Sequence, residues 1–205
     1  MIAFPNQLTI LRILLTPVFV AFLFSPDAMS KQLALVVFIA AALTDWYDGW
    51  VARRFGYASR LGKFLDPLAD KILASAALIA FVYLNLAEAW MVWIIVGRDI
   101  VVTAFRAYAE WKNKPIITTF SAKVKTFSQM VLIFYILILY TLRHTPLAWK
   151  NSQGLIETLM HKAVLDGLML LITLFTLWTG VTYVIENRKM IRELYVNFGR
   201  TAEPR

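Results

Sequence analysis

Long apolar stretches separated by short polar segments make up most of this chain of 205 residues. A helix needs about 20 mainly apolar residues to cross a bilayer, and several stretches approach that length. The pattern therefore predicts an all-α, polytopic membrane protein with six transmembrane helices, in one domain over residues 1–205. The expected spans are 8–24, 33–55, 62–84, 89–108, 127–142 and 163–185, with a basic linker before residue 127 and a polar loop at 143–162.

The composition agrees with a membrane protein, because hydrophobic residues make up 60% of the chain and the mean hydropathy is +0.63. The net charge of +8 indicates an anionic partner, such as a phosphorylated substrate or acidic membrane lipids. We find no nucleic-acid-binding motif and expect no nucleic-acid partner. The absence of cysteine excludes disulfides and thiolate metal sites, and we expect no cleaved signal peptide.

The distribution of Lys and Arg predicts how the spans are oriented. With six spans, the segments 53–63 and 106–125 and the tail from residue 186 lie on one side, and together they carry fourteen Lys and Arg. The opposite side carries four, at Lys31, Arg143, Lys150 and Lys162. An excess of Lys and Arg marks the cytoplasmic side. We therefore expect a multi-pass protein of the inner (cytoplasmic) membrane, with both termini and segment 45–70 facing the cytoplasm.

Four carboxylates lie where the second and third expected spans meet this side. Asp45 and Asp48 are three residues apart and Asp66 and Asp70 are four apart, so each pair shares one face of a helix. Four carboxylates beside a bilayer repel one another unless cations neutralise them. Because oxygen ligands without His or Cys favour Mg²⁺ or Mn²⁺ over Zn²⁺, we predict that these four aspartates are metal ligands.

Small residues and one arginine accompany the first carboxylate pair. Gly49 and Ala52 lie on nearly the same helical stripe as the pair, so the phosphates or sugar of a ligand can approach the backbone closely. Arg53 ends the stripe with a guanidinium fork that suits phosphate. The full pattern, D-x2-D-G-x2-A-R-x8-G-x3-D-x3-D, is formed by Asp45, Asp48, Gly49, Ala52, Arg53, Gly62, Asp66 and Asp70.

This pattern resembles the signature of the CDP-alcohol phosphotransferases at all eight positions. Members of that family transfer a phosphate-linked group from a CDP-alcohol to a second alcohol and release CMP. Two metal ions held by the carboxylates suit such a transfer, because they can stabilise both the attacking and the leaving oxygen. The resemblance implies that Asp70, besides touching the metal site, is the catalytic general base, and that the protein is a homodimer.

The resemblance also assigns the binding site for the CDP-linked substrate. The residues it implies are Gly49, Ala52, Arg53 and Ser59, with Thr9 and Arg12 contributing from the first span. For Arg12, an arginine that extends its charge to the membrane interface is an equal alternative.

Basic residues of the fourth and fifth spans indicate the acceptor. Arg98 and Arg106 are eight residues apart, on one side of a helix, and Lys123 and Lys125 precede the fifth span. This charge predicts a phosphorylated acceptor, with the general positive charge of a cytoplasmic face as the alternative explanation. The phosphatidylglycerophosphate synthases of this family resemble the chain in three further stretches, NQLTILRILLTPVF, VGRDIVVTAFRAYAE and SAKVKTFSQM. They imply CDP-diacylglycerol as the donor and sn-glycerol 3-phosphate as the acceptor.

Other functions share parts of this pattern. A phosphatidylserine, phosphatidylinositol phosphate or cardiolipin-type synthase has the same signature and differs in its acceptor. A cation or proton transporter can carry acidic pairs near its spans, but transport explains neither Gly49 and Ala52 nor the complete pattern. A non-catalytic membrane scaffold leaves the carboxylates without a purpose. Release of CMP from CDP-diacylglycerol distinguishes the enzyme from the last two.

Overall fold

The computed structural model describes residues 4–55, 60–111 and 120–188, and within them the side chains of 4–8, 45–55, 60–68, 108, 110, 111 and 148 lie outside the description. All elements in the described ranges are helices, so the prediction of an all-α protein is confirmed there. The helices are α1 (Phe4–Phe24), α2 (Ala28–Phe55), α3 (Arg60–Tyr83), α4 (Ala89–Trp111), α5 (Phe120–His144), α6 (Pro146–Leu159) and α7 (Lys162–Glu186).

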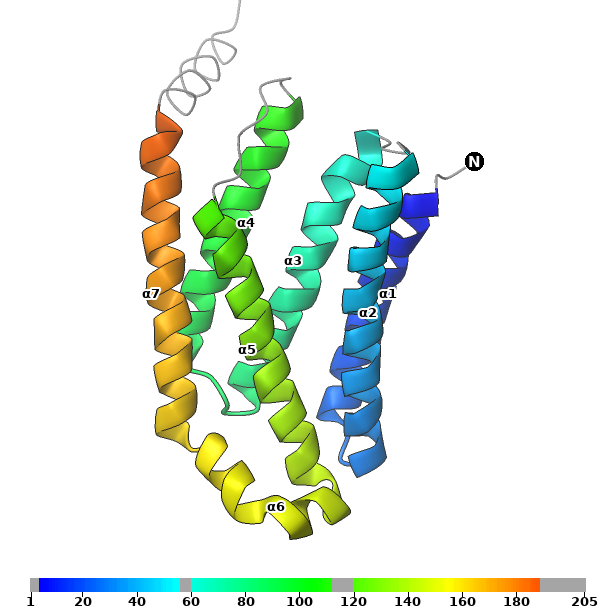
Figure 1. The fold of residues 1–205 in the computed structure, drawn as a ribbon, viewed down its shortest axis with the longest axis vertical. Helices are drawn as coiled ribbons and strands as arrows, with labels where there is room; N and C mark the ends of the chain where they lie inside the picture. The colour runs from blue at the N-terminus through cyan, green and yellow to red at the C-terminus, as the bar shows by residue number, and fades with distance from the viewer. Residues whose placement is uncertain (1–3, 56–59, 112–119, 189–205) are drawn as a thin grey trace, which may run out of the picture.

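The longer helices run roughly along the long axis of the molecule, and α6 lies across one end of the bundle (Figure 1). Helix α1 packs on α2 and α3, α4 packs on α3 and α7, and α5 contacts α2, α6 and α7. The start of α1 and the end of α7 lie at the end of the bundle away from α6 (Figure 1). These two helix ends therefore lie at the same end of the bundle.

Aromatic packing fixes the contact between α1, α2 and α5. The ring of Phe38 in α2 is fully buried, and its centroid lies 5.1 Å from that of Phe19 in α1 and 5.2 Å from that of Phe134 in α5. Ala34 and Ala41 of α2 are also fully buried, and such small residues let neighbouring helices approach closely. This cluster packs α1, α2 and α5 tightly against one another.

A tight turn at 84–88 joins α3 to α4, close to the gap expected between the spans at 62–84 and 89–108. Asn85 adopts a left-handed backbone with φ of 58°, which asparagine tolerates better than most residues. The Leu86 N–H donates to the Phe81 carbonyl at 2.8 Å and the Asn85 N–H to the Val82 carbonyl at 3.0 Å, so two of the last carbonyls of α3 are satisfied. The turn makes α3 and α4 antiparallel neighbours.

The prediction of a polar loop at 143–162 is wrong, because helix α6 occupies most of this range. The helix is short and bent at Ser152 (φ −137°, ψ 22°), and most of its side chains are exposed. It is held to the bundle by the buried side chain of Ile156 and by the Tyr135 hydroxyl, which donates to the Leu159 carbonyl at 2.9 Å. Few apolar residues therefore anchor this helix, which is why the sequence pattern did not reveal it.

The start of the fifth span was also predicted wrongly. Helix α5 begins at Phe120, so Lys123 and Lys125 lie inside the helix and not in a linker. The Lys125 side chain is completely buried, and a buried ammonium is tolerated only beside a counter-charge. Asp99 of α4 supplies that counter-charge, as described below.

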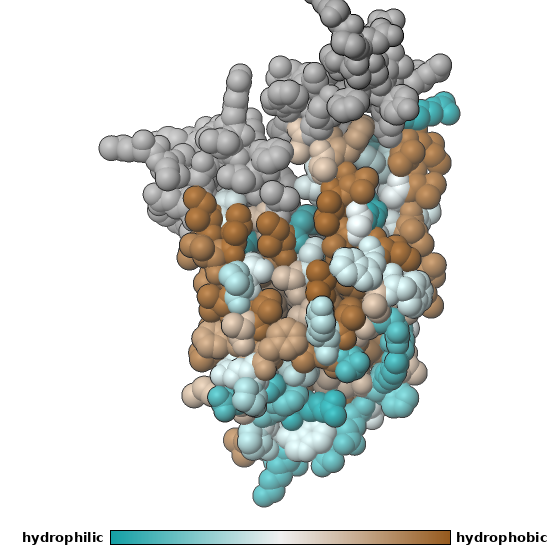
Figure 2. Space-filling view, turned by 180° about the vertical axis from the view of Figure 1, so that it is seen from behind, coloured by the Kyte–Doolittle hydropathy of each residue, from teal (hydrophilic) through white to brown (hydrophobic). Residues whose placement is uncertain are grey.

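Two described helices, Phe120–His144 and Lys162–Glu186, are long and apolar enough to cross a membrane, and shorter apolar helical segments lie at Thr9–Phe24 and Ala28–Thr44. Many large apolar side chains on these helices are exposed, among them Leu14, Val36, Val131, Leu171 and Trp178. Figure 2 shows hydrophobic side chains over much of one face and hydrophilic ones gathered at the end formed by α6. These helices support two of the six predicted spans.

Candidate active site

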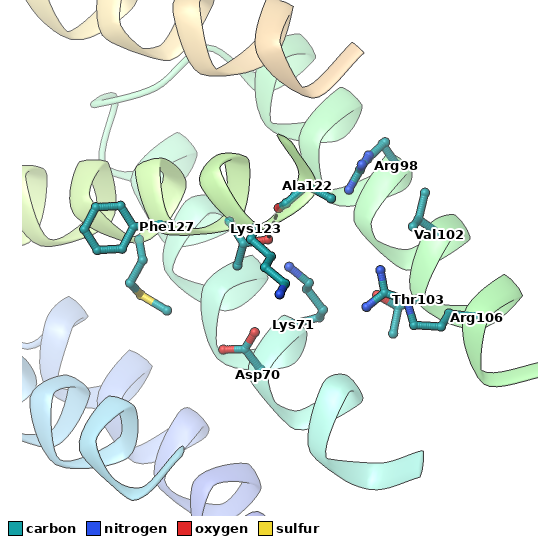
Figure 3. A pocket seen from close by; sticks show the side chains of 11 residues that line it. Asp70, Lys71, Arg98, Val102, Thr103, Arg106, Ala122, Lys123 and Phe127 are labelled. Carbon is teal, nitrogen blue, oxygen red and sulfur yellow. Dashed lines mark hydrogen bonds between the residues drawn. The ribbon is translucent and has the colours of Figure 1, made fainter. Parts of the chain in front are cut away.

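A cavity of about 430 Å³ lies between α3, α4 and α5 (Figure 3). Four cationic side chains and one carboxylate line it, from Lys71, Arg98, Arg106, Lys123 and Asp70. The remaining wall is apolar or carries hydroxyl groups, from Val102, Thr103, Ala122, Thr126, Phe127 and Met130. With all five charged groups ionised, the lining has four positive charges and one negative, which is an excess suited to a small anion.

The cavity unites most of the basic residues that the sequence assigned to an acceptor. The predicted placement of Arg98 and Arg106 on one side of a helix is confirmed, because both line this cavity from α4. Lys123 lines it from the first turns of α5. Lys125 is not among the lining residues, and its fully buried ammonium is bound within the protein.

Asp99 of α4 is the partner of that ammonium and is itself only 2% exposed. Its Oδ1 lies 2.6 Å from Lys125 Nζ of α5 and 3.1 Å from an Arg98 guanidinium nitrogen, and its Oδ2 lies 3.4 Å from Lys71 Nζ of α3. Lys125 also donates to Gln129 Oε1 at 2.6 Å. One buried carboxylate therefore joins three helices and three cations, which satisfies the requirement that buried charges be paired.

The two arginines of the cavity differ in how they are held. Besides its contact with Asp99, Arg98 donates to Thr179 Oγ1 of α7 at 3.2 Å, and a Cβ at Gly180 would lie 3.4 Å from its Cγ. Arg106 has neither of these contacts, but the Nε of both arginines is buried without a hydrogen-bond partner in the described structure. Because a buried donor without a partner is unfavourable, both guanidinium groups are suited to bind an anion that enters the cavity.

The structure places the predicted metal ligands on two neighbouring helices. The backbone positions of Asp45 and Asp48 lie in the last part of α2 and those of Asp66 and Asp70 in the first part of α3, and the two helices contact each other. Asp70 is partly buried and lines the cavity (Figure 3). The side chains of Asp45, Asp48 and Asp66, like those of Gly49, Ala52 and Arg53, lie outside the described residues, as does all of Ser59.

The four carboxylates of Asp45, Asp48, Asp66 and Asp70 are of the chemical type that binds a divalent ion. Residues three and four apart in a helix share a face, and the contact between α2 and α3 puts the two pairs on adjacent helices. Carboxylate oxygens are the ligands that Mg²⁺ and Mn²⁺ prefer. The four aspartates thus remain the predicted metal ligands.

Thr9 and Arg12, predicted to contact the CDP-linked substrate, are buried between α1 and its neighbours. Arg12 is 1% exposed, and its Nε donates to the Ala41 carbonyl of α2 at 3.3 Å. The alternative in which Arg12 reaches toward the membrane interface is therefore wrong. Its position ties α1 to the helix that carries Asp45 and Asp48, and its contact with the substrate stays a prediction.

Sequence reasoning assigned no functional role to two residues of this region, Lys71 and Asp99. Lys71 directly follows the second carboxylate pair and lines the cavity. Asp99 is an acidic residue inside an apolar stretch. Such a residue signals a buried partner, and its partners lie 26 and 28 residues away on other helices.

Comparisons with known proteins agree with the signature. The family profile of the CDP-alcohol phosphatidyltransferases matches residues 2–178. A Bacillus subtilis protein named CDP-diacylglycerol–glycerol-3-phosphate 3-phosphatidyltransferase is 36% identical over 146 residues, which cover 65% of this chain and 76% of that protein. Proteins of the same name from Escherichia coli K12 and Salmonella paratyphi A are 31% and 30% identical over 189 residues, covering 88% of this chain and 92% of each relative.

The profile covers well over half of the chain, and the three relatives cover most of it at 30% identity or more. The resemblance drawn from the eight-position pattern is confirmed by these independent matches. The chain therefore belongs to the CDP-alcohol phosphatidyltransferase family.

Proposed function

We propose that this protein transfers the phosphatidyl group of CDP-diacylglycerol to sn-glycerol 3-phosphate, giving phosphatidylglycerophosphate and CMP. The cationic cavity beside Asp70 is the observation that carries this proposal within the family. A phosphate monoester brings about two negative charges, which Lys71, Arg98, Arg106 and Lys123 can balance. The names of the relatives described above support the same donor and acceptor.

The four basic residues would bind and orient the acceptor, and Asp70 would act on its hydroxyl. The acceptor oxygen forms a bond to the phosphorus of the phosphatidyl group while the pyrophosphate bond to CMP breaks. Asp70 takes the hydroxyl proton on a carboxylate oxygen, which increases the nucleophilicity of the acceptor as the new bond forms. Lys71, Arg98 and Arg106 hold the acceptor phosphate so that its hydroxyl faces that carboxylate.

Two Mg²⁺ or Mn²⁺ ions, when bound to Asp45, Asp48, Asp66 and Asp70, would supply stabilisation of charge on the pyrophosphate and attacking oxygens. Gly49, Ala52, Arg53 and Ser59 belong to the same proposed site, on the side of the CDP group. Thr9 and Arg12 complete it from α1, where Arg12 is already in contact with α2.

The same proposal includes a place in the membrane. Six spans formed by α1 to α5 and α7 would leave α6 on the surface at one side and open the cavity at the other, consistent with the directions of these helices in Figure 1. The Lys and Arg count assigns the cavity side to the cytoplasm, where soluble glycerol 3-phosphate is available. Assembly as a homodimer in the inner membrane is part of the proposal and rests on the family resemblance.

A panel of acceptors tests the proposed reaction. We expect the purified protein, given radiolabelled CDP-diacylglycerol, to form a phosphatidyl product with glycerol 3-phosphate and to release CMP. Serine, inositol phosphate and phosphatidylglycerol serve as the competing acceptors, and thin-layer chromatography identifies the lipid formed. Faster turnover with any of these three would assign the chain to another branch of the family, and ion flux without CMP release would indicate a transporter.

Removing one arginine separates acceptor binding from donor binding. We expect Arg106→Ala to raise the KM for glycerol 3-phosphate about tenfold to a hundredfold, because a hydrogen bond to a charged group contributes roughly 1.5–3 kcal/mol. Arg106→Lys should recover only part of the loss, since an ammonium lacks the bidentate fork. The KM for CDP-diacylglycerol should change little in steady-state assays. Lys150→Ala, on the exposed surface of α6, is the control.

If Arg106→Ala instead weakens only the donor, the cavity is not the acceptor site. An unchanged KM for both substrates would contradict any role of the cavity in binding.

Loss of single aspartates tests the metal site. We expect Asp45→Asn, Asp48→Asn and Asp66→Asn each to lower the rate by about a hundredfold or more, because each removes a charged ligand from ions that stabilise the transition state. Excess EDTA should abolish activity and added Mg²⁺ or Mn²⁺ should restore it. Asp27→Asn, an exposed position between α1 and α2, is the matched control. Turnover at the wild-type rate in any of the three variants would remove that residue from the ligand set.

Single cysteines test the orientation in the membrane, in a chain that has none of its own. We expect Ser59→Cys and Lys114→Cys to resist a membrane-impermeant thiol reagent in intact cells, because both lie on the predicted cytoplasmic side. Ser152→Cys, at an exposed position of α6, should react. Labelling after permeabilisation shows that all three cysteines are reactive. Reaction of Ser59→Cys in intact cells would reverse the proposed orientation.

A further inference from the structure

The cations around the cavity fall into two groups according to their partners. Lys71 and Arg98 line the cavity and also contact the Asp99 carboxylate, at 3.4 Å and 3.1 Å. Arg106 and Lys123 line it without a carboxylate within 4 Å among the described residues. Asp99 therefore holds two of the four cations that line the cavity, and the other two have no carboxylate partner among the described residues.

Asp99 itself is not part of the cavity wall. Its side chain is 2% exposed, and the nearest group behind it is the Lys125 ammonium at 2.6 Å, which is completely buried. These two opposite charges neutralise each other, and the contacts with Lys71 and Arg98 are additional. Asp99 can therefore influence a ligand in the cavity only through the side chains that it holds.

Without that carboxylate, the three cations would repel one another. Lys71, Arg98 and Lys125 come from three different helices and have nitrogen atoms within 3.4 Å of a single carboxylate. Like charges at such separations are unfavourable in a poorly hydrated site. Repulsion would shift Lys71 and Arg98 from the positions that Asp99 gives them, because these side chains are 15% and 12% exposed whereas Lys125 is enclosed.

We propose that Asp99 is a positioning residue for the acceptor phosphate: it holds Lys71 and Arg98 at the cavity wall before the acceptor binds. This inference rests on the proposed function, in which the cavity binds the phosphate of the acceptor. Side chains that are already held in place lose little conformational freedom on binding, so the affinity for the acceptor is higher than the same cations would give unaided. In the proposed function the donor binds on the side of α2, so we expect its binding not to depend on this arrangement.

A double-mutant cycle with Lys125 tests the proposal, since Asp99→Asn alone leaves a buried ammonium unpaired and can destabilise the fold. In the Lys125→Met background the buried charge is gone, so Asp99→Asn removes only the contacts with Lys71 and Arg98. We expect this second change to raise the KM for glycerol 3-phosphate about tenfold over Lys125→Met alone. The KM for CDP-diacylglycerol and the melting temperature of the detergent-solubilised protein should stay close to those of Lys125→Met.

A purely structural role for Asp99 predicts a different result. In that case the double variant and Lys125→Met have the same KM for the acceptor, and this equality would overturn the proposal. A parallel rise in the KM of both substrates would do so as well, because it indicates general damage. Glu88→Gln, which breaks the exposed pair between Glu88 and Lys162 at 2.7 Å, is the control for losing an ion pair and should change neither KM.

The wild-type assay separates this proposal from the proposed function. If the wild-type protein forms product only with an acceptor that lacks a phosphate, the proposed function is wrong and the positioning role is overturned with it. If it uses glycerol 3-phosphate or another phosphorylated acceptor, the cycle is measured with that acceptor. If Asp99→Asn then leaves the KM for that acceptor unchanged in the Lys125→Met background, the positioning role of Asp99 is contradicted and the proposed function is not.

Discussion

The buried carboxylate of Asp99 is the contact on which the geometry of the cavity depends. It lies where α3, α4 and α5 meet, and each of these helices contributes one cation to it, from Lys71, Arg98 and Lys125. A charge that is almost fully enclosed is tolerated only when paired and hydrogen-bonded, so α3, α4 and α5 must stay close enough for the three cations to reach the carboxylate. Apolar packing between helices is less specific, because many similar side chains can interdigitate in more than one way.

The remainder of the bundle keeps this charged centre in place. The aromatic contacts of Phe38 with Phe19 and Phe134 join α2 to α1 and α5, so the helix that carries Asp45 and Asp48 is fixed relative to the helix that carries Lys125. Arg98 is also tied to Thr179 of α7. The apolar core therefore positions helices, and the polar contacts position the individual side chains that face the cavity.

The sequence predicted those parts of the structure that follow from local spacing. The helices, the turn after α3 and the shared side of Arg98 and Arg106 all follow from the helical period and from the length of apolar stretches. The contacts of Asp99 with Lys71 and Lys125 span 28 and 26 residues, and no local rule predicts which distant cation a buried carboxylate will meet. Helix α6 was missed because it is short and less apolar than the other described helices, and Ile156 is the buried residue within it.

The order of residues on α3 explains how one cavity can contain both a proposed general base and a cation that binds the acceptor phosphate. Asp70 and Lys71 are neighbours in the chain and both line the cavity, yet adjacent side chains on a helix point in directions about 100° apart. Lys71 is directed toward Asp99 of α4, whereas Asp70 belongs to the carboxylate pair that shares a face with position 66. Within a single turn of α3, the proposed acid–base group and one acceptor-binding cation thus point in different directions. Asp99 maintains this separation, because it draws the Lys71 ammonium toward α4 and so toward the side on which an acceptor phosphate would bind.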